Sequence, residues 1–76
     1  TNGISLGHGY TTPDIEEAFI KSLAIDHSYV SYVLADSSKF GKVSAVTIAS
    51  LDKACILTDR LPDASYCKQT LVKEVD

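Results

Sequence analysis

The 76-residue sequence contains no methionine, and it begins with Thr1. We therefore expect a piece of a longer protein that has further domains upstream. No apolar run approaches the roughly 20 residues that a membrane-spanning helix needs. No charged segment followed by an apolar one opens the chain, so these residues contain no signal peptide. Since 45% of the residues are hydrophobic, the composition indicates one small folded domain.

Basic residues are few, with 7 Lys and Arg against 10 Asp and Glu, and the net charge is −3. They form no basic stripe, which makes this segment a poor binder of DNA or RNA on its own. Two cysteines are too few for a disulfide framework or a zinc site. Cys55 lies in an apolar run and is predicted to be a buried small hydrophobic residue. An intracellular, cytoplasmic location fits this cysteine usage best.

The N-terminal third of the chain predicts a loop followed by a helix. Residues 1–12 hold three of the four glycines, which is typical of a loop, with a short strand around Ile4–Leu6. Thr12 is predicted to cap a helix with Pro13 at its first position, and acidic residues fill its first turn. The helix should end near Asp26. Its apolar positions follow a helical spacing and predict one packing face: Ile15, Ala18, Phe19, Ile20 and Leu23.

The rest of the chain predicts three strands and a second helix. Tyr29–Ala35 is apolar on both faces, which is typical of the middle of a parallel sheet. Ala45–Ala49 and Cys55–Thr58 are further strand candidates, with a turn at Leu51–Ala54 between them. A final helix is predicted from Leu61 to about Val75. The expected class is α/β, with a small, mostly parallel sheet flanked by helices.

So few strands and helices make a poor independent parallel sheet, because such a sheet is normally covered on both faces. We therefore expect association through an exposed sheet edge or an apolar face, and a homo-oligomer.

A polar turn follows the first predicted strand and is the strongest candidate for a site. It carries the carboxylate of Asp36, two serine hydroxyls, the ammonium group of Lys39 and a closing Gly41. Ligand sites of parallel sheets lie at the carboxyl ends of the strands, and lysine is a compact cation suited to phosphate. The alternative is a solvated turn, because Asp and Ser favour turns by bonding their own backbone.

Other polar segments have two interpretations each. Gly7–Thr12 is either a connector or a backbone and hydroxyl surface that faces a ligand beside a helix N-terminus. Glu16 and Glu17 fit an acidic first helical turn, and Thr58–Asp59 either ends a strand or faces a pocket. His8 and His27 lack a metal-ligand spacing, so the sequence predicts no metal and no cofactor.

Several segments carry a resemblance to a known family. They are Gly3 and Gly7, Gly9–Thr12, Glu17–Ala18, Leu34–Gly41 and Thr58–Asp59. Together they resemble the sensor domain of DeoR-type bacterial transcriptional repressors, over almost the whole chain. The resemblance implies a fold like ribose-5-phosphate isomerase and a phosphorylated sugar as effector. It also implies that this chain is the C-terminal part of the sensor, and that DNA is bound only by an N-terminal winged helix-turn-helix domain absent from it.

The resemblance further implies residue roles. Lys39 would contact the phosphate, Asp36 and Ser38 would shape the turn or bind sugar hydroxyls, and Glu16 or Glu17 would lie near the isomerase's catalytic glutamate. The full set of implied effector-binding residues is Lys39, Asp36, Ser38, Thr11, Thr12 and Glu17.

The leading hypothesis is therefore a non-enzymatic sensor whose effector shifts the whole repressor between arrangements that do and do not bind DNA. One alternative is a sugar-phosphate isomerase fragment with Glu17 as general base. Another is a structural dimerisation module in which the polar turn only ends a strand.

Overall fold

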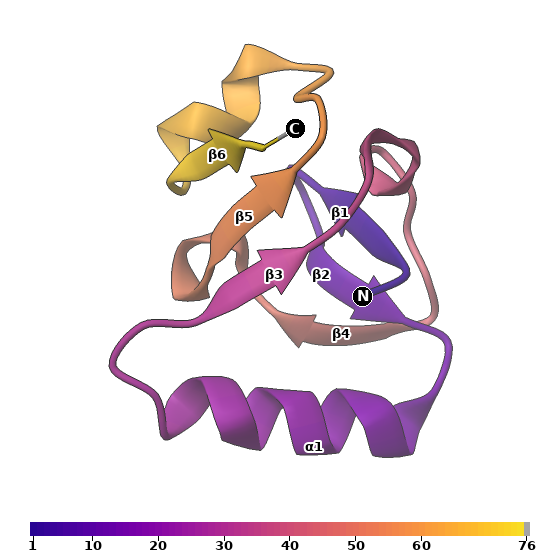
Figure 1. Ribbon diagram of the computed structural model, residues 1–76. Helices are drawn as coiled ribbons and strands as arrows, with labels where there is room; N and C mark the ends of the chain where they lie inside the picture. Colours follow the sequence, from indigo (N-terminus) through magenta and orange to yellow (C-terminus); the bar gives the residue numbers. More distant parts are fainter. Residues whose placement is uncertain (76) are drawn as a thin grey trace.

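The computed structural model describes residues 1–75, which form two three-stranded sheets and one α-helix (Figure 1). The elements are β1 (Gly3–Ser5), β2 (Gly9–Thr12), α1 (Ile15–Asp26), β3 (Tyr32–Leu34), β4 (Val46–Ala49), β5 (Cys55–Thr58) and β6 (Val72–Glu74). Short 3₁₀ turns lie at Ser37–Lys39, Leu51–Lys53 and Ala64–Lys68. The fold is α/β, as the sequence predicted. No helix among the described residues has the length and apolar character needed to cross a membrane.

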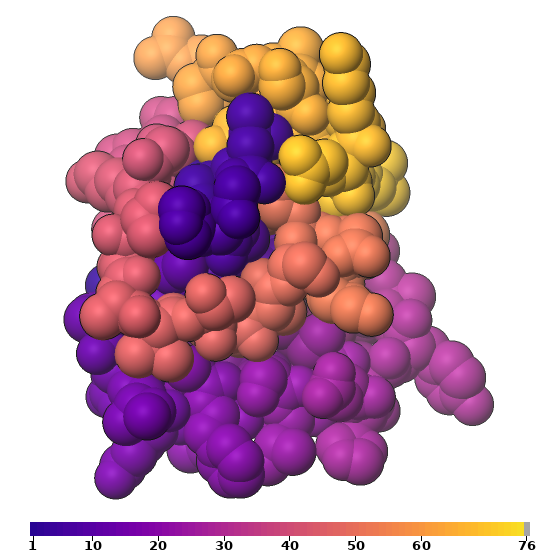
Figure 2. Space-filling view, turned by 180° about the vertical axis from the view of Figure 1, so that it is seen from behind, coloured from indigo at the N-terminus to yellow at the C-terminus, as the bar shows by residue number. Residues whose placement is uncertain are grey.

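The two sheets differ in strand direction. One has the order β1-β2-β4 and is antiparallel, and the other has the order β3-β5-β6 and is parallel. The prediction of a mostly parallel sheet is therefore wrong. Helix α1 packs on β2 and β4 and runs along one side of the molecule (Figure 1). Figure 2 shows the molecule from behind, with the purple residues of the α1 region along its lower side. The strands predicted at Ala45–Ala49 and Cys55–Thr58, and the turn between them, are confirmed.

Strand β3 lies at the edge of the parallel sheet, and β5 lies in its centre. The prediction that Tyr29–Ala35 forms a central strand is wrong. That prediction assumed that a segment with apolar residues on both faces is buried on both faces. In the structure, two of the three residues of β3 are exposed: Leu34 is 75% exposed and Tyr32 is 55% exposed.

Residues 3–12 form a hairpin of β1 and β2 rather than a loop, and β1 confirms the short strand predicted around Ile4–Leu6. Gly9 makes the hairpin possible, because its φ is +71° and a Cβ there would lie 2.2 Å from the carbonyl oxygen of Ala49. Only glycine permits both the left-handed conformation and this close approach to β4. The glycines of this segment therefore build a strand pair instead of preventing one.

Helix α1 begins two residues later than predicted. Thr12 is the last residue of β2, and Asp14 is the N-cap. The carboxylate of Asp14 accepts from the backbone N–H groups of Glu16 (2.9 Å) and Glu17 (3.3 Å). Pairing of Thr12 with Val46 keeps Thr12 extended and moves the helix start. The helix ends at Asp26, as predicted, and His27 is its C-cap.

The apolar stripe of α1 is mostly exposed. Ala18 is the one buried residue of the helix, while Ile15 is 71% exposed and Phe19 is 64% exposed. The predicted packing face is thus confirmed at Ala18 and wrong at its four larger apolar positions, which are exposed.

The predicted C-terminal helix is also wrong. A 3₁₀ turn occupies Ala64–Lys68, and Val72–Glu74 forms β6, which pairs with β5. The pairing with β5 supplies hydrogen bonds that local helix propensity cannot predict. Asp63 caps the 3₁₀ turn by accepting from the N–H of Ser65 at 2.8 Å.

The core joins the two sheets. It contains Ile4, Tyr10, Ala18, Ile48, Leu51, Ala54, Ile56 and Tyr66. The buried hydroxyl of Tyr10 lies 2.9 Å from the carbonyl oxygen of Ala54 and 3.1 Å from that of Leu51. Burial raises the pKa of Tyr10 above its ordinary value, so the phenol remains a neutral donor. Cys55, predicted to be buried, is half-buried.

Candidate functional site

The polar turn begins where β3 leaves the parallel sheet. The N–H of Ala35 donates to the carbonyl of Leu57 at 3.0 Å, and the 3₁₀ turn Ser37–Lys39 follows directly. The carboxylate of Asp36 accepts from the hydroxyl of Ser38 and from its N–H, the latter at 2.9 Å. These bonds, the hydroxyl bond first, lower the pKa of Asp36. Since the ionised form accepts them, acid that protonates Asp36 removes this contribution to the turn.

The other end of the turn is fixed to the core. The N–H of Gly41 donates to the carbonyl of Ile4 at 2.7 Å, and Ile4 and Phe40 form an isolated parallel bridge. The ring of Phe40 packs edge-on against Tyr66, with centroids 4.9 Å apart and planes at 79°. The hydroxyl of Tyr66 donates to the same Ile4 carbonyl at 3.2 Å. The turn is therefore held at both ends.

The carboxyl end of β5 lies beside this turn. The carboxylate of Asp59 accepts from the N–H of Ser37 at 2.8 Å and from the N–H of Arg60 at 2.9 Å. An open pocket of about 380 Å³ lies at these strand ends. It is lined by Leu34, Ala35, Asp36, Leu57, Thr58, Asp59 and Val75. A pocket with this position and these carboxylates offers acceptors for hydroxyl groups of a ligand.

Lys39 supplies the positive charge of the turn. Its N–H donates to the carbonyl of Asp36 at 3.1 Å, and the residue is half-buried. The ion pair between Lys21 and Glu17 is the only one among residues 1–75, so within them the ammonium of Lys39 has no carboxylate partner. Lys39 does not line the pocket at the strand ends, whereas Asp36 of the same turn does.

Thr11 and Thr12 lie inside the fold. Both are fully buried, and their hydroxyls bond to protein atoms. The Oγ1 of Thr11 accepts from the N–H of Ser44 at 2.9 Å and so anchors the loop after the polar turn. The hydroxyl of Thr12 donates to the side chain of Asn2 at 3.2 Å and accepts from the N–H of Asp14 at 3.4 Å. In this structure these two residues support neighbouring segments and present no surface to a ligand.

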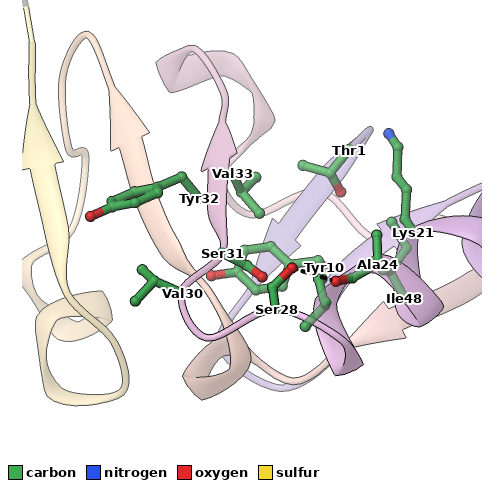
Figure 3. Close-up of a pocket in the computed structure, with 11 residues that line it drawn as sticks. Thr1, Tyr10, Lys21, Ala24, Ser28, Val30, Ser31, Tyr32, Val33 and Ile48 are labelled. Atoms are coloured by element: carbon green, nitrogen blue, oxygen red, sulfur yellow. Dashed lines mark hydrogen bonds between the residues drawn. The ribbon is translucent and has the colours of Figure 1, made fainter.

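Glu17 lies on α1, away from the polar turn and paired with Lys21. Its carboxylate accepts from the Nζ of Lys21 at 2.6 Å, and this bond raises the pKa of Lys21. Lys21 lines a second pocket, of about 330 Å³, which lies between α1 and β3 (Figure 3). Tyr10, Ile25, Ile48 and Val33 contribute apolar surface to this pocket, and no carboxylate among residues 1–75 lines it, whereas Asp36 and Asp59 line the pocket at the strand ends.

The described residues hold no group of three or more His, Cys, Asp or Glu side chains that could bind a metal ion. His8 is exposed in the β1–β2 hairpin, where its N–H donates to the hydroxyl of Ser5 at 3.0 Å.

The sequence predicted the turn, and of its two interpretations of Thr58–Asp59 the structure supports a segment that faces a pocket. The bond from the turn to Asp59 was not predicted. The structure brings Asp36, Ser38 and Lys39 together on one turn, with Asp59 beside them, and places Glu17 on α1, where it pairs with Lys21. A signal for Asp59 exists in the sequence, because two strands of the same sheet each end close to an aspartate.

Residues 1–60 match the family model described as the DeoR C terminal sensor domain. A relative from Bacillus subtilis (strain 168), the uncharacterized HTH-type transcriptional regulator FruR, is 42% identical over 78 residues. That alignment covers 99% of this chain and 31% of the relative. The HTH-type transcriptional regulator IolR of the same organism is 40% identical over 65 residues, covering 84% of this chain and 26% of the relative.

A lactose phosphotransferase system repressor from Staphylococcus epidermidis (strain ATCC 35984) is 38% identical over 60 residues. The alignment covers 78% of this chain and 24% of the repressor. The chain therefore spans about a third or less of the length of these relatives.

Proposed function

Because this chain belongs to the family of DeoR C-terminal sensor domains, we propose that it senses a phosphorylated sugar and thereby changes DNA binding by a longer repressor. The relatives named above are transcriptional regulators, and the name of one concerns the lactose phosphotransferase system. We place this chain in the C-terminal part of the sensor, and we assign DNA binding to a helix-turn-helix domain outside it.

The anchored turn between Asp36 and Gly41 is the observation that carries this proposal. It offers one cation, Lys39, that lacks a carboxylate partner among residues 1–75, and a carboxylate, Asp36, that lines an open pocket. We assign the phosphate to Lys39 and the sugar hydroxyls to Asp36 and Ser38. A lysine and a pair of short polar side chains suit a ligand with one anionic end and one hydroxyl-rich end.

The remaining implied residues take supporting roles in this proposal. Thr11 holds the loop that follows the turn, and Thr12 holds the segment that leads into α1. Glu17 lies on α1, where its carboxylate pairs with Lys21, a residue of the pocket between α1 and β3. This ion pair disfavours Glu17 as a general base, so the proposal is a non-enzymatic sensor.

Sensing also requires that the effector bind two states of the repressor with different affinities. The turn suits such a role because it joins both sheets, through Leu57 of β5 on one side and Ile4 of β1 on the other. A ligand held at the turn can therefore favour one arrangement of the two sheets over another.

Calorimetry with a panel of sugar phosphates and their unphosphorylated counterparts tests the proposal. We expect the repressor containing this chain to prefer the phosphorylated members, and Lys39→Ala to weaken that binding by about tenfold or more, since hydrogen bonds to charged groups contribute about 1.5–3 kcal/mol. Lys42→Ala is the matched control, because it removes the same charge from an exposed position three residues away. Equal affinity in wild type and Lys39→Ala would refute the assignment of Lys39.

A further inference from the structure

The first two amides of the polar turn need acceptors from outside its own backbone. In a helical turn the leading N–H groups have no partner within the turn. Asp36 supplies an acceptor for the N–H of Ser38 at 2.9 Å. The N–H of Ser37 is instead bonded at 2.8 Å to a carboxylate 22 positions away, that of Asp59.

Strand register explains why Asp59 can reach this amide. Leu34 pairs with Leu57 in the parallel ladder of β3 and β5. Positions 36 and 59 each lie two residues beyond that pair, and therefore at the same level of the sheet. The backbone bond from Ala35 to Leu57 is followed by the bond from Ser37 to Asp59. A side chain thus continues the link between the two chain segments after their strands have ended.

The acceptor is itself fixed in place. The same oxygen of Asp59 accepts from the N–H of Arg60 at 2.9 Å and lies 3.3 Å from the hydroxyl oxygen of Thr58. Thr58 is buried at the end of β5, the central strand of its sheet. A carboxylate oriented by its own backbone is a rigid partner for the turn, as supporting groups around binding sites commonly are.

We propose that Asp59 is a positioning residue: its carboxylate holds the amide of Ser37 and thereby sets how Ser38 and Lys39 face the effector. This inference rests on the proposed function. In this role Asp59 must place a hydrogen-bond acceptor oxygen at the N–H of Ser37. Its negative charge need not contact the ligand. Asparagine keeps such an oxygen, and alanine does not.

The experiment compares Asp59→Ala with Asp59→Asn in the longer repressor that contains this chain. Amide NMR spectra are recorded without ligand and during titration with ribose 5-phosphate and with inorganic phosphate. We expect Asp59→Ala to move the Ser37 resonance and to weaken ribose 5-phosphate binding about tenfold, the scale of one charge-assisted hydrogen bond. Asp59→Asn should recover most of that loss. Dispersed spectra of both variants show that they are folded.

A second measurement compares wild type with Asp59→Asn, so it does not depend on whether Asp59→Ala folds. The Ser37 amide resonance should move in Asp59→Asn, because a neutral acceptor replaces a charged one, and a resonance that does not move would overturn the positioning role. The Ser38 amide, which bonds to Asp36, should keep its position in both proteins and serves as the internal control.

The outcomes separate the two claims. A wild-type repressor that binds none of the sugar phosphates in the calorimetry panel overturns the proposed function, and the positioning role with it. Binding by wild type that is unchanged in Asp59→Ala overturns the positioning role alone. Tighter binding of inorganic phosphate by Asp59→Ala also overturns it, because Asp59 would then compete with the ligand for the Ser37 amide.

Discussion

Gly41 shows how one residue sets the shape of the proposed site. Its φ of +81° lies in the left-handed region, and its N–H donates to the carbonyl of Ile4 at 2.7 Å. The chain can therefore turn back toward β1 immediately after Phe40, whose ring packs on Tyr66. Because Lys39 precedes this fixed point by two residues, the left-handed conformation at position 41 helps to determine where the ammonium group can lie.

Replacing Gly41 by alanine tests this role. A Cβ at position 41 meets no atom within 4 Å, so the whole cost is backbone strain. We expect Gly41→Ala to lower the free energy of unfolding by about 1–2 kcal/mol, the cost of a left-handed conformation for a residue with a Cβ. Urea denaturation followed by circular dichroism measures this loss.

Gly7→Ala is the matched control, because position 7 also has open space around it but no positive φ. It should leave the stability unchanged or raise it by about 0.4–1 kcal/mol through the unfolded chain. Equal effects of the two substitutions would contradict the strain argument.

At the scale of elements, the sequence was most informative where local chemistry decides the structure. The helix was predicted to end near Asp26 and does so, and the strands over Val46–Ala49 and Cys55–Thr58 were predicted closely. The polar turn was also predicted, since Asp and Ser favour turns wherever they occur.

Predictions failed where a distant segment decides the structure. Val72–Glu74 forms a strand because its backbone pairs with β5. Thr12 is extended because it pairs with Val46 of β4. The contact between Asp59 and Ser37 likewise depends on the pairing of β3 with β5 and joins residues that lie 22 positions apart in sequence. Sequence periodicity carries no direct information on such pairings, so the turn was predictable and its support from β5 was not.

The corrected start of α1 leads to a prediction at this scale. Asp14→Ala removes the side-chain acceptor for the N–H groups of Glu16 and Glu17, and should cost about 1 kcal/mol of stability. Thermal unfolding followed at 222 nm measures the change. Asp26→Ala is the control, because it removes the same carboxylate from the last residue of the helix, where negative charge is unfavourable. A loss in Asp26→Ala as large as in Asp14→Ala would contradict the assignment of the N-cap.

At the scale of the whole molecule, several large apolar side chains are exposed, among them Tyr32 and Leu34 of β3. The parallel sheet has an open edge at β3, and the segment from Ser28 to Ala35 carries no charged side chain. Leu34 of this edge is paired in register with the half-buried Leu57. An exposed, uncharged edge strand is a surface on which another strand can pair. The oligomer expected from the sequence therefore has a definite candidate surface.

Leu34→Lys tests whether this surface drives association. We expect the wild-type chain to self-associate as its concentration rises, and Leu34→Lys to weaken association by about tenfold or more, because burying a leucine contributes about 1.5–3 kcal/mol. Sedimentation velocity over a concentration series measures both. Val43→Lys is the matched control, since Val43 is also exposed and lies outside both sheets. A wild-type chain that stays monomeric throughout, or equal weakening by Val43→Lys, would show that the β3 edge is not the contact, because only a charge placed at that edge should oppose strand pairing there.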